Sequence, residues 1–336
     1  MKKVLLSRSK NFYKANLHCH STISDGSKTP EELKKMYMEH GYSIIAYTDH
    51  DVLIPHSELN EENFLALNGY EMEVNALGKA WSDTKTCHMC YIALEPDNLK
   101  QVCYHRGDYL FGNAPNYRSQ LCFDENEPDF IRKYTPECIN EMIARGRKGG
   151  FFVTYNHPAW SLETLNDYGN YHGMNAMEIC NYGCFESGFT DYNEKEYDEM
   201  LRGGERIFCI STDDNHNYRK DSFGGFTFIN ADKLEYKTIT TALSDGKFYA
   251  SQGPEIYELW YEDDKIHIEC SDASSIRLNT AKRDTFCISA ENEDKPLTSA
   301  IFDVKDFFDY VRITVTDFSG NHANTNAYFV DELKGE

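Results

Sequence analysis

The chain has 336 residues, of which 40% are hydrophobic and 26% are charged, a composition typical of a folded protein rather than a disordered one. Its formal net charge of −21 leaves little basic surplus for a broad face that binds duplex nucleic acid. No apolar run approaches the length that spans a bilayer, so we expect no membrane partner.

The first half of the chain predicts strands that alternate with helices. Residues 14–17 are expected to form a strand that leads into NLHCHSTISDG. The sequence TPEE at 29–32 is typical of a capping box with proline at the first helical position, and it predicts a helix to about His40. SIIAYTDHD, at 43–51, is an apolar run that ends in polar residues. It predicts a buried strand with chemistry at its carboxyl end.

The same pattern recurs in FLALNGYEMEV, FFVTYNHP, NAMEICNYG and RIFCISTDDNH, with helical stretches at 136–147 and 192–201. Alternating strands and helices indicate a parallel sheet, and polar groups after successive strands indicate a barrel with its site at the carboxyl ends of the strands. We assign residues 1–253 to this domain. Residues 95–134 lack a clear period and predict a long insertion, and 254–336 predict a small antiparallel β-domain.

Two histidines with one residue between them stand at the end of the first predicted strand. On a strand, His18 and His20 would point to the same side, and Asp25 follows closely. Imidazole and carboxylate groups bind zinc, iron and manganese. Two surface histidines in a turn would give the same pattern, so this stretch alone leaves both readings open.

Further metal-ligand types follow other predicted strands. Any one of them alone is more often structural than a ligand, but chance does not readily place so many on one face of a fold. With the first three, the set is His18, His20, Asp25, His50, Glu71, His88, His157, Asp214 and His216.

HCHSTISDG, TDHD, the glutamate of GYE, the histidine of CHMCYI, NHP and DDNH resemble the successive motifs of the PHP (polymerase and histidinol phosphatase) family. Their order and rough spacing match over about residues 14–252, and SDGKFYASQGP resembles the end of PHP domains that carry a C-terminal β-module. The resemblance implies an α/β fold: a distorted barrel of seven parallel strands followed by a small antiparallel β-domain, whose role the sequence does not give.

The resemblance also implies two to three divalent metal ions (Mn, Fe or Zn), and a complete ligand set favours three. The first would be bound by His18, His20 and Asp214, with Glu71 bridging it to the second. His88 and His157 would complete the second, and Asp25, His50 and His216 would bind the third.

Three divalent cations and three carboxylates leave a charge of about +3, which attracts a phosphate ester and deprotonates a bound water. The resemblance therefore implies a metal-dependent phosphatase or phosphodiesterase that hydrolyses a small phosphomonoester or nucleotide-like substrate. A metal-bridging hydroxide held by Glu71 would be the nucleophile and Asp25 a candidate acid. An amidohydrolase-like metal-dependent hydrolase, or a metal-binding module without turnover, are the alternatives. The oligomeric state is not predicted.

Substrate-binding residues are harder to predict. Arg106, Arg118 and Arg219 could bind phosphate through their guanidinium groups, although an arginine is more often a solvated surface residue. Trp160, just after NHP, is expected at the mouth of the pocket. Four aromatic residues of the insertion could stack a nucleobase or pack the insertion onto the barrel: Tyr104, Tyr109, Phe111 and Tyr117.

Other polar residues near the motifs have less specific patterns. Asp49, Asp51 and Asp213 flank predicted ligands and could either orient histidines or cap helices. Cys87 and Cys90 lack a second CxxC pair, so they predict buried strand residues rather than a zinc knuckle. The start, MKKVLLSRSKNFYK, has too short an apolar run for a signal peptide, so the 11 cysteines are expected to be reduced thiols of a cytoplasmic protein.

Overall fold

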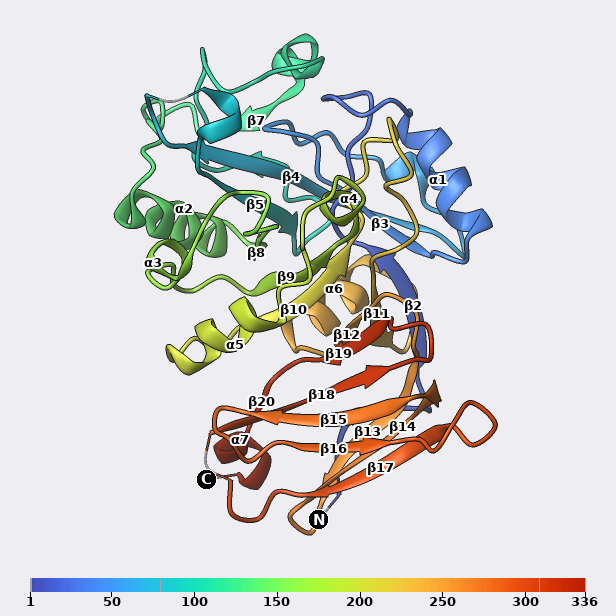
Figure 1. The fold of residues 1–336 in the computed structure, drawn as a ribbon. Helices are drawn as coiled ribbons and strands as arrows, with labels where there is room; N and C mark the ends of the chain where they lie inside the picture. The colour runs from blue at the N-terminus through green and yellow to red at the C-terminus, as the bar shows by residue number, and fades with distance from the viewer. Residues whose placement is uncertain (1, 79, 308, 336) are drawn as a thin grey trace.

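The computed structural model describes residues 2–78, 80–307 and 309–335, which form a mixed α/β fold around one large sheet (Figure 1). Nine neighbouring strands of this sheet come from the first three quarters of the chain. In sheet order they are β10 (Phe208–Thr212), β9 (Ala176–Asn181), β8 (Phe151–Tyr155), β5 (Thr86–Ala93), β4 (Leu65–Asn75), β3 (Ile44–Tyr47), β2 (Asn11–Asn16), β11 (Phe226–Ala231) and β12 (Phe248–Ser251).

The predicted distorted barrel of seven parallel strands is not confirmed in the described residues. β2, β3 and β4 pair in parallel, as do β8, β9 and β10, but β5 is antiparallel to both of its neighbours. The link from β4 to β5 is too short to hold a crossover helix, so these strands must form a hairpin. The segments that follow β2 and the edge strand β10, the seventh and first strands in this order, meet at one parallel bridge between Cys19 and Asn215.

The helices expected before His40, at 136–147 and at 192–201 are present, and the other helices of this part were not predicted. The predicted capping box of α1 (Pro30–Glu39) is confirmed, because Thr29 Oγ1 accepts the Glu32 amide (3.3 Å) and the Glu32 carboxylate accepts the Thr29 amide (2.9 Å). No helix in the described ranges combines the length and apolarity needed to cross a bilayer. The remaining helices of this part are α2 (Pro136–Lys148), α3 (Leu165–Tyr168), α4 (Tyr182–Glu186), α5 (Glu194–Arg202) and α6 (Tyr236–Ser244).

The insertion folds over the upper end of the sheet in Figure 1. The Asn113 amide donates to the Ser24 carbonyl (2.7 Å), and the Phe111 ring lies 4.6 Å from that of His50. Buried Arg132 forms an ion pair with Asp51, which holds the far end of the insertion beside the motif TDHD. Its regular elements are β6 (Lys100–Gln101), η3 (Ala114–Gln120) and β7 (Cys122–Phe123), after the short helices η1 (Ser57–Leu59) and η2 (Trp81–Asp83).

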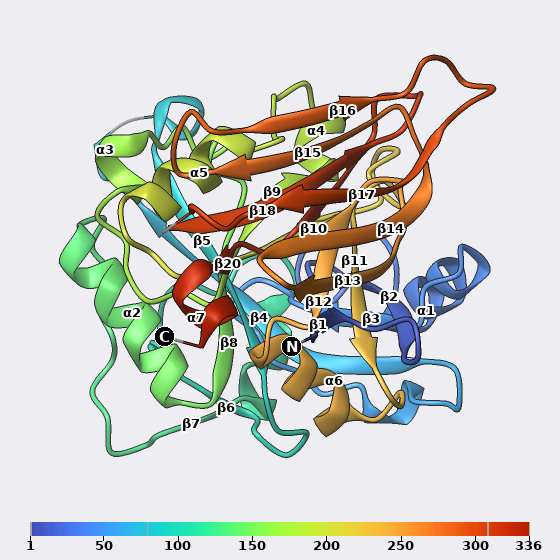
Figure 2. The ribbon, with the colours of Figure 1, turned by 90° about the horizontal axis from the view of Figure 1, so that it is seen from below.

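The C-terminal part forms a β-sandwich at the lower end of the molecule in Figure 1, away from the insertion (Figures 1 and 2). β12 pairs with β19, so the large sheet continues through β19 (His322–Thr325), β18 (Tyr310–Thr316), β15 (Ser275–Thr280) and β16 (Phe286–Ser289), with β20 (Tyr328–Phe329) beside β18. Opposite it lies a sheet of β1 (Lys3–Leu6), β13 (Ile256–Glu262), β14 (Lys265–Ala273) and β17 (Leu297–Asp303), and helix α7 (Val330–Lys334) ends the chain. The first strand therefore pairs with the predicted C-terminal domain, which adds a link across the predicted boundary at 253/254.

A buried arginine joins the sandwich to helix α5. The side chain of Arg312, on β18, has no exposed surface and forms two hydrogen bonds of 2.9 Å with the Asp198 carboxylate. It also donates to Glu194 at 3.1 Å. Asn326 adds a second contact, since its amide donates to the carbonyls of Gly246 (3.1 Å) and Phe248 (3.0 Å). These buried polar contacts fix the sandwich against the rest of the fold.

Candidate metal centre

The nine predicted ligands converge near the carboxyl end of the parallel strands. His18, His20 and Asp25 follow β2, and the other six come from β3, β4, β5, β8 and β10 or the turns after them. Their ligand atoms fall into five overlapping groups, and within each group all of the atoms lie within 4.8 Å of one another. These groups contain all nine residues and add Cys90 and Glu178.

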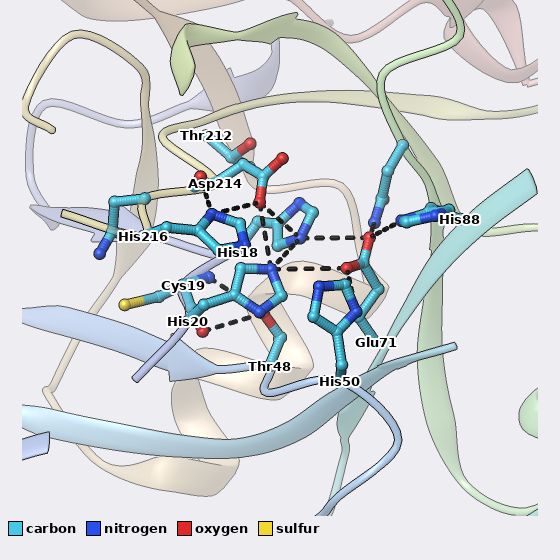
Figure 3. A network of polar contacts seen from close by, with 12 residues as sticks. His18, Cys19, His20, Thr48, His50, Glu71, His88, Thr212, Asp214 and His216 are labelled. Carbon is cyan, nitrogen blue, oxygen red and sulfur yellow. Dashed lines mark hydrogen bonds and ion pairs between the residues drawn. The ribbon is translucent and has the colours of Figure 1, made fainter. Parts of the chain in front are cut away.

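Glu71 occupies the middle of this cluster (Figure 3). Burial alone would raise the pKa of its carboxyl group, but the surrounding histidines, His18 first among them, hold it well below the usual range. The carboxylate is therefore ionised and can neutralise cations on more than one side. Five imidazoles lie within 3.5 Å of its oxygens: those of His88 (3.1 Å), His18 (3.2 Å), His50 (3.2 Å), His20 (3.4 Å) and His157 (3.5 Å).

His18, His20 and Asp214 form a compact group. The two histidine Nε2 atoms are 3.0 Å apart, and they lie 3.2 and 3.1 Å from Asp214 Oδ1. Ligand atoms that share a cation at about 2.1 Å lie about 3.0–3.4 Å from each other. The spacing of this triangle fits one metal ion, with the three ligands that the sequence motifs imply for the first metal.

Two histidines lie near more than one of the expected metal positions. His50 Nδ1 lies 3.2 Å from Glu71 and its Nε2 lies 3.8 Å from Asp25, so this ring stands between the expected second and third metals. His157 groups with His18 and Glu178, while its Nε2 also lies 3.8 Å from Asp214 Oδ2. The three residues expected around a third metal, Asp25, His50 and His216, lie in one group together with His20, and His216 Nε2 is 3.5 Å from Asp25.

Glu178, on β9, is a residue of the centre that the sequence prediction omitted. Its buried carboxylate lies 2.7 Å from His18 Nδ1 and accepts hydrogen bonds from Thr212 Oγ1 (2.6 Å) and the His157 amide (3.0 Å). The signal was a lone carboxylate in the apolar strand NAMEICN, because a buried charge requires a partner. Glu178 therefore orients His18 with its Nε2 atom toward Asp214.

Two more histidines have one ring nitrogen fixed from outside. His157 Nδ1 lies 3.2 Å from Ser161 Oγ, and His216 Nδ1 lies 3.1 Å from the carbonyl of Asp214. When each Nδ1 donates its proton to that oxygen, the Nε2 lone pair faces the cluster. Outer partners of this kind accompany histidines that bind metals.

The polar atoms of the cluster fit divalent cations. Within the described chain, His20 Nδ1, His50 Nδ1, His88 Nε2 and Asp214 Oδ1 are buried and form no hydrogen bond. Burial lowers the pKa of His20, yet the nearby carboxylates of Asp214 and Glu71 raise it to about 10. Burial and the charge of His20 lower the pKa of His50 to about 3. The carboxylates thus favour positive charge in the cluster. Protons would place that charge on His20 but not on the neighbouring His50, whereas metal ions can lie between the rings.

Asp49, Asp51 and Asp213 hold loops rather than histidines. Asp49 accepts hydrogen bonds from the amides of Ser21 (2.8 Å) and Ser24 (3.0 Å), which shapes the loop after His20. Asp213 accepts the amides of residues 223–225 at 2.7 to 3.0 Å. Asp51 forms its ion pair with Arg132, a residue that the sequence prediction did not include.

The guanidinium groups of the three predicted phosphate-binding arginines are bound elsewhere. Arg106 donates to Asp129 (2.6 Å) and to two main-chain carbonyls of the insertion, and Arg118 donates to the carbonyls of residues 106 and 107. Arg219 donates to Ser187 Oγ at 2.8 Å. The insertion thus uses two of these arginines to hold its own loops, and the structure does not bring them into the cluster.

A cavity of about 630 Å³ adjoins the cluster, and the predicted pocket residue Trp160 lines it. The Trp160 ring lies 5.3 Å from His88 and 5.0 Å from His157. Glu73 also lines the cavity, with its carboxylate 3.4 Å from His88 Nε2. A small molecule in this cavity would therefore touch the ring of a candidate metal ligand.

No protein-family model matches the chain, and no curated protein matches it. Among the solved structures that align with it, three are 16% identical to this chain. A two-domain protein from Bacteroides vulgatus, described as containing a predicted PHP-like metal-dependent phosphoesterase, covers 97% of this chain and 98% of its own with a TM-score of 0.44. A proposed metal-dependent phosphoesterase from Bifidobacterium adolescentis covers 68% and 96% with a TM-score of 0.40.

The third is an amidohydrolase from Chromobacterium violaceum with bound sulfate and no metal, which covers 62% of this chain and 89% of its own with a TM-score of 0.36. The first structure carries the family description that the sequence motifs resemble.

Proposed function

We propose that this chain is a metal-dependent phosphoesterase of the PHP type that hydrolyses a small phosphomonoester. The observation that carries the proposal is the buried carboxylate of Glu71 with five imidazoles within 3.5 Å of its oxygens. A structural glutamate requires one or two partners, whereas a carboxylate between two cations requires ligands on several sides.

The chain's own residues prepare the centre for metals. Glu178 and Ser161 hold the rings of His18 and His157 with Nε2 facing inward. His18, His20 and Asp214 would hold the first ion, Glu71 would bridge it to a second beside His88, and Asp25 and His216 would hold a third. Divalent ions bound there would neutralise phosphate oxygens and lower the pKa of water.

Asp25 suits the role of ligand better than that of acid. Its side chain is 32% exposed and lies between His50 and His216. Burial raises the pKa of Asp25, but the hydrogen bond from His216 and the charges of His50 and His20 lower it well below its usual range. An ionised carboxylate accepts a cation and has no proton to give to a leaving alcohol.

Release of inorganic phosphate from a panel of phosphomonoesters tests the proposal. We expect turnover of at least one ester, its loss after treatment with a chelator, and its return when Mn²⁺ or Zn²⁺ is added. A parallel panel of amides and lactones gives the comparison. Hydrolysis of those compounds without any release of phosphate, or phosphate release that a chelator does not affect, would reject the assignment.

A further inference from the structure

The cavity beside the centre has walls that are unusually aromatic. Trp81, Tyr109, Phe111, Trp160 and Phe189 line it, and they come from η2, the insertion and the segments after β8 and α4. Trp81 and Phe189 keep 82% and 37% of their surface exposed. Large exposed apolar side chains gathered at one hollow typically mark a binding surface.

The aromatic walls continue up to the cluster. The Trp81 ring lies 6.2 Å from that of Trp160 in an edge-to-face arrangement, and Trp160 in turn contacts His88. On the opposite side, Phe111 lies 4.6 Å from His50. A molecule whose phosphate reaches the centre would therefore have its remaining part between these rings.

The charge of the cavity disfavours a second anionic group. Glu73 brings a carboxylate to the end nearest the centre, and none of the described residues that line the cavity is lysine or arginine. Arg132 lies close by, but its guanidinium donates to Asp51 (3.0 Å) and to the carbonyl of Glu73 (2.9 Å). Guanidinium groups are a common means by which proteins bind phosphate and carboxylate.

We propose that the part of the substrate beyond its phosphate is an aromatic or similarly flat apolar group that carries no second negative charge. This inference rests on the proposed phosphoesterase function and specifies its substrate class. Stacking between rings holds such a group with little regard to its detailed chemistry. The Glu73 carboxylate repels a second phosphate or a carboxylate on this part of the substrate.

Tryptophan fluorescence can test the proposal without turnover. The chain has three tryptophans, and Trp260 lies on β13 against His267, with ring centroids 4.6 Å apart. In a Trp260→Phe background, only Trp81 and Trp160 report. Phenylphosphonate, methylphosphonate and 3-phosphonopropionate are suitable probes, because a phosphoesterase does not cleave their P–C bonds.

In the metal-loaded chain, we expect phenylphosphonate to change the fluorescence saturably. It should bind about tenfold more tightly, or better, than either of the other probes. The affinities of those two probes are measured by competition with phenylphosphonate. Trp81→Ala should remove most of this preference, while the control Leu77→Ala, at a 95% exposed residue of the same β4–β5 connection, should keep it. Glu73→Gln, checked for unchanged metal content, should reduce the difference in affinity between phenylphosphonate and 3-phosphonopropionate.

Equal affinity for phenyl- and methylphosphonate, or a preference that survives Trp81→Ala, would overturn the inference. Phosphate release from simple esters would then still support the proposed function. Conversely, a chain that binds phenylphosphonate with the expected preference but hydrolyses no phosphate ester would uphold the aromatic site and reject the phosphoesterase assignment.

Discussion

Replacing Glu71 with glutamine is expected to release at least one equivalent of metal and to lower phosphatase activity by about a hundredfold or more. The change keeps the shape of the side chain but removes its charge, so repulsion between two cations only a few ångströms apart is no longer offset. Elemental analysis of the purified variant gives the metal content, and phosphate release gives the activity.

Glu178→Gln is the matched control, because Glu178 is equally buried but contacts His18 from outside the cluster. We expect it to weaken metal affinity by about 10–100-fold while saturating metal restores the full stoichiometry. If Glu71→Gln keeps its full metal content and near-normal turnover, Glu71 does not bridge two metals.

Replacing Arg312 with methionine is expected to lower the free energy of unfolding by about 3–5 kcal/mol. The substitution keeps much of the side-chain volume but removes the buried cation from Asp198, whose side chain is 14% exposed, and leaves it with the longer ion pair to Arg202 at 3.7 Å. Urea unfolding followed by circular dichroism measures the loss. The metal content of the folded variant should not change, because none of the candidate ligand groups includes a residue of this contact.

Arg277→Met provides the comparison. Arg277 lies on the adjacent strand β15, is 40% exposed and faces the same Glu194 at 3.5 Å. An exposed pair of this kind contributes about 0–1 kcal/mol, so this variant should be nearly as stable as the unsubstituted chain. If both substitutions lower the free energy of unfolding equally, burial does not make the Arg312 contact more stabilising than the exposed one.

Much of the centre is predictable because its pattern is local. His18 and His20 stand two residues apart after a strand, which places both rings on one side, and their Nε2 atoms lie 3.0 Å apart. The capping box at Thr29 likewise depends on four consecutive residues and is confirmed. Both features follow from short-range geometry that the sequence contains.

The features that escaped prediction depend on which strands are neighbours. The apolar run of β5 carries no sign of its direction, so its antiparallel pairing with β4 and β8 was not expected. Glu178 acquires its role because β9 lies between β8 and β10. The pair of Arg132 and Asp51 joins residues 81 positions apart, a separation that no local pattern spans.

The metal content of the chain, purified without chelators and measured by elemental analysis, tests the central claim most directly. We predict two to three equivalents of manganese, iron or zinc per chain, lost on exhaustive chelation and regained when the metal is added back. A folded chain that holds no metal and binds neither added Mn²⁺ nor Zn²⁺ would contradict a metal centre built on Glu71 and its surrounding histidines.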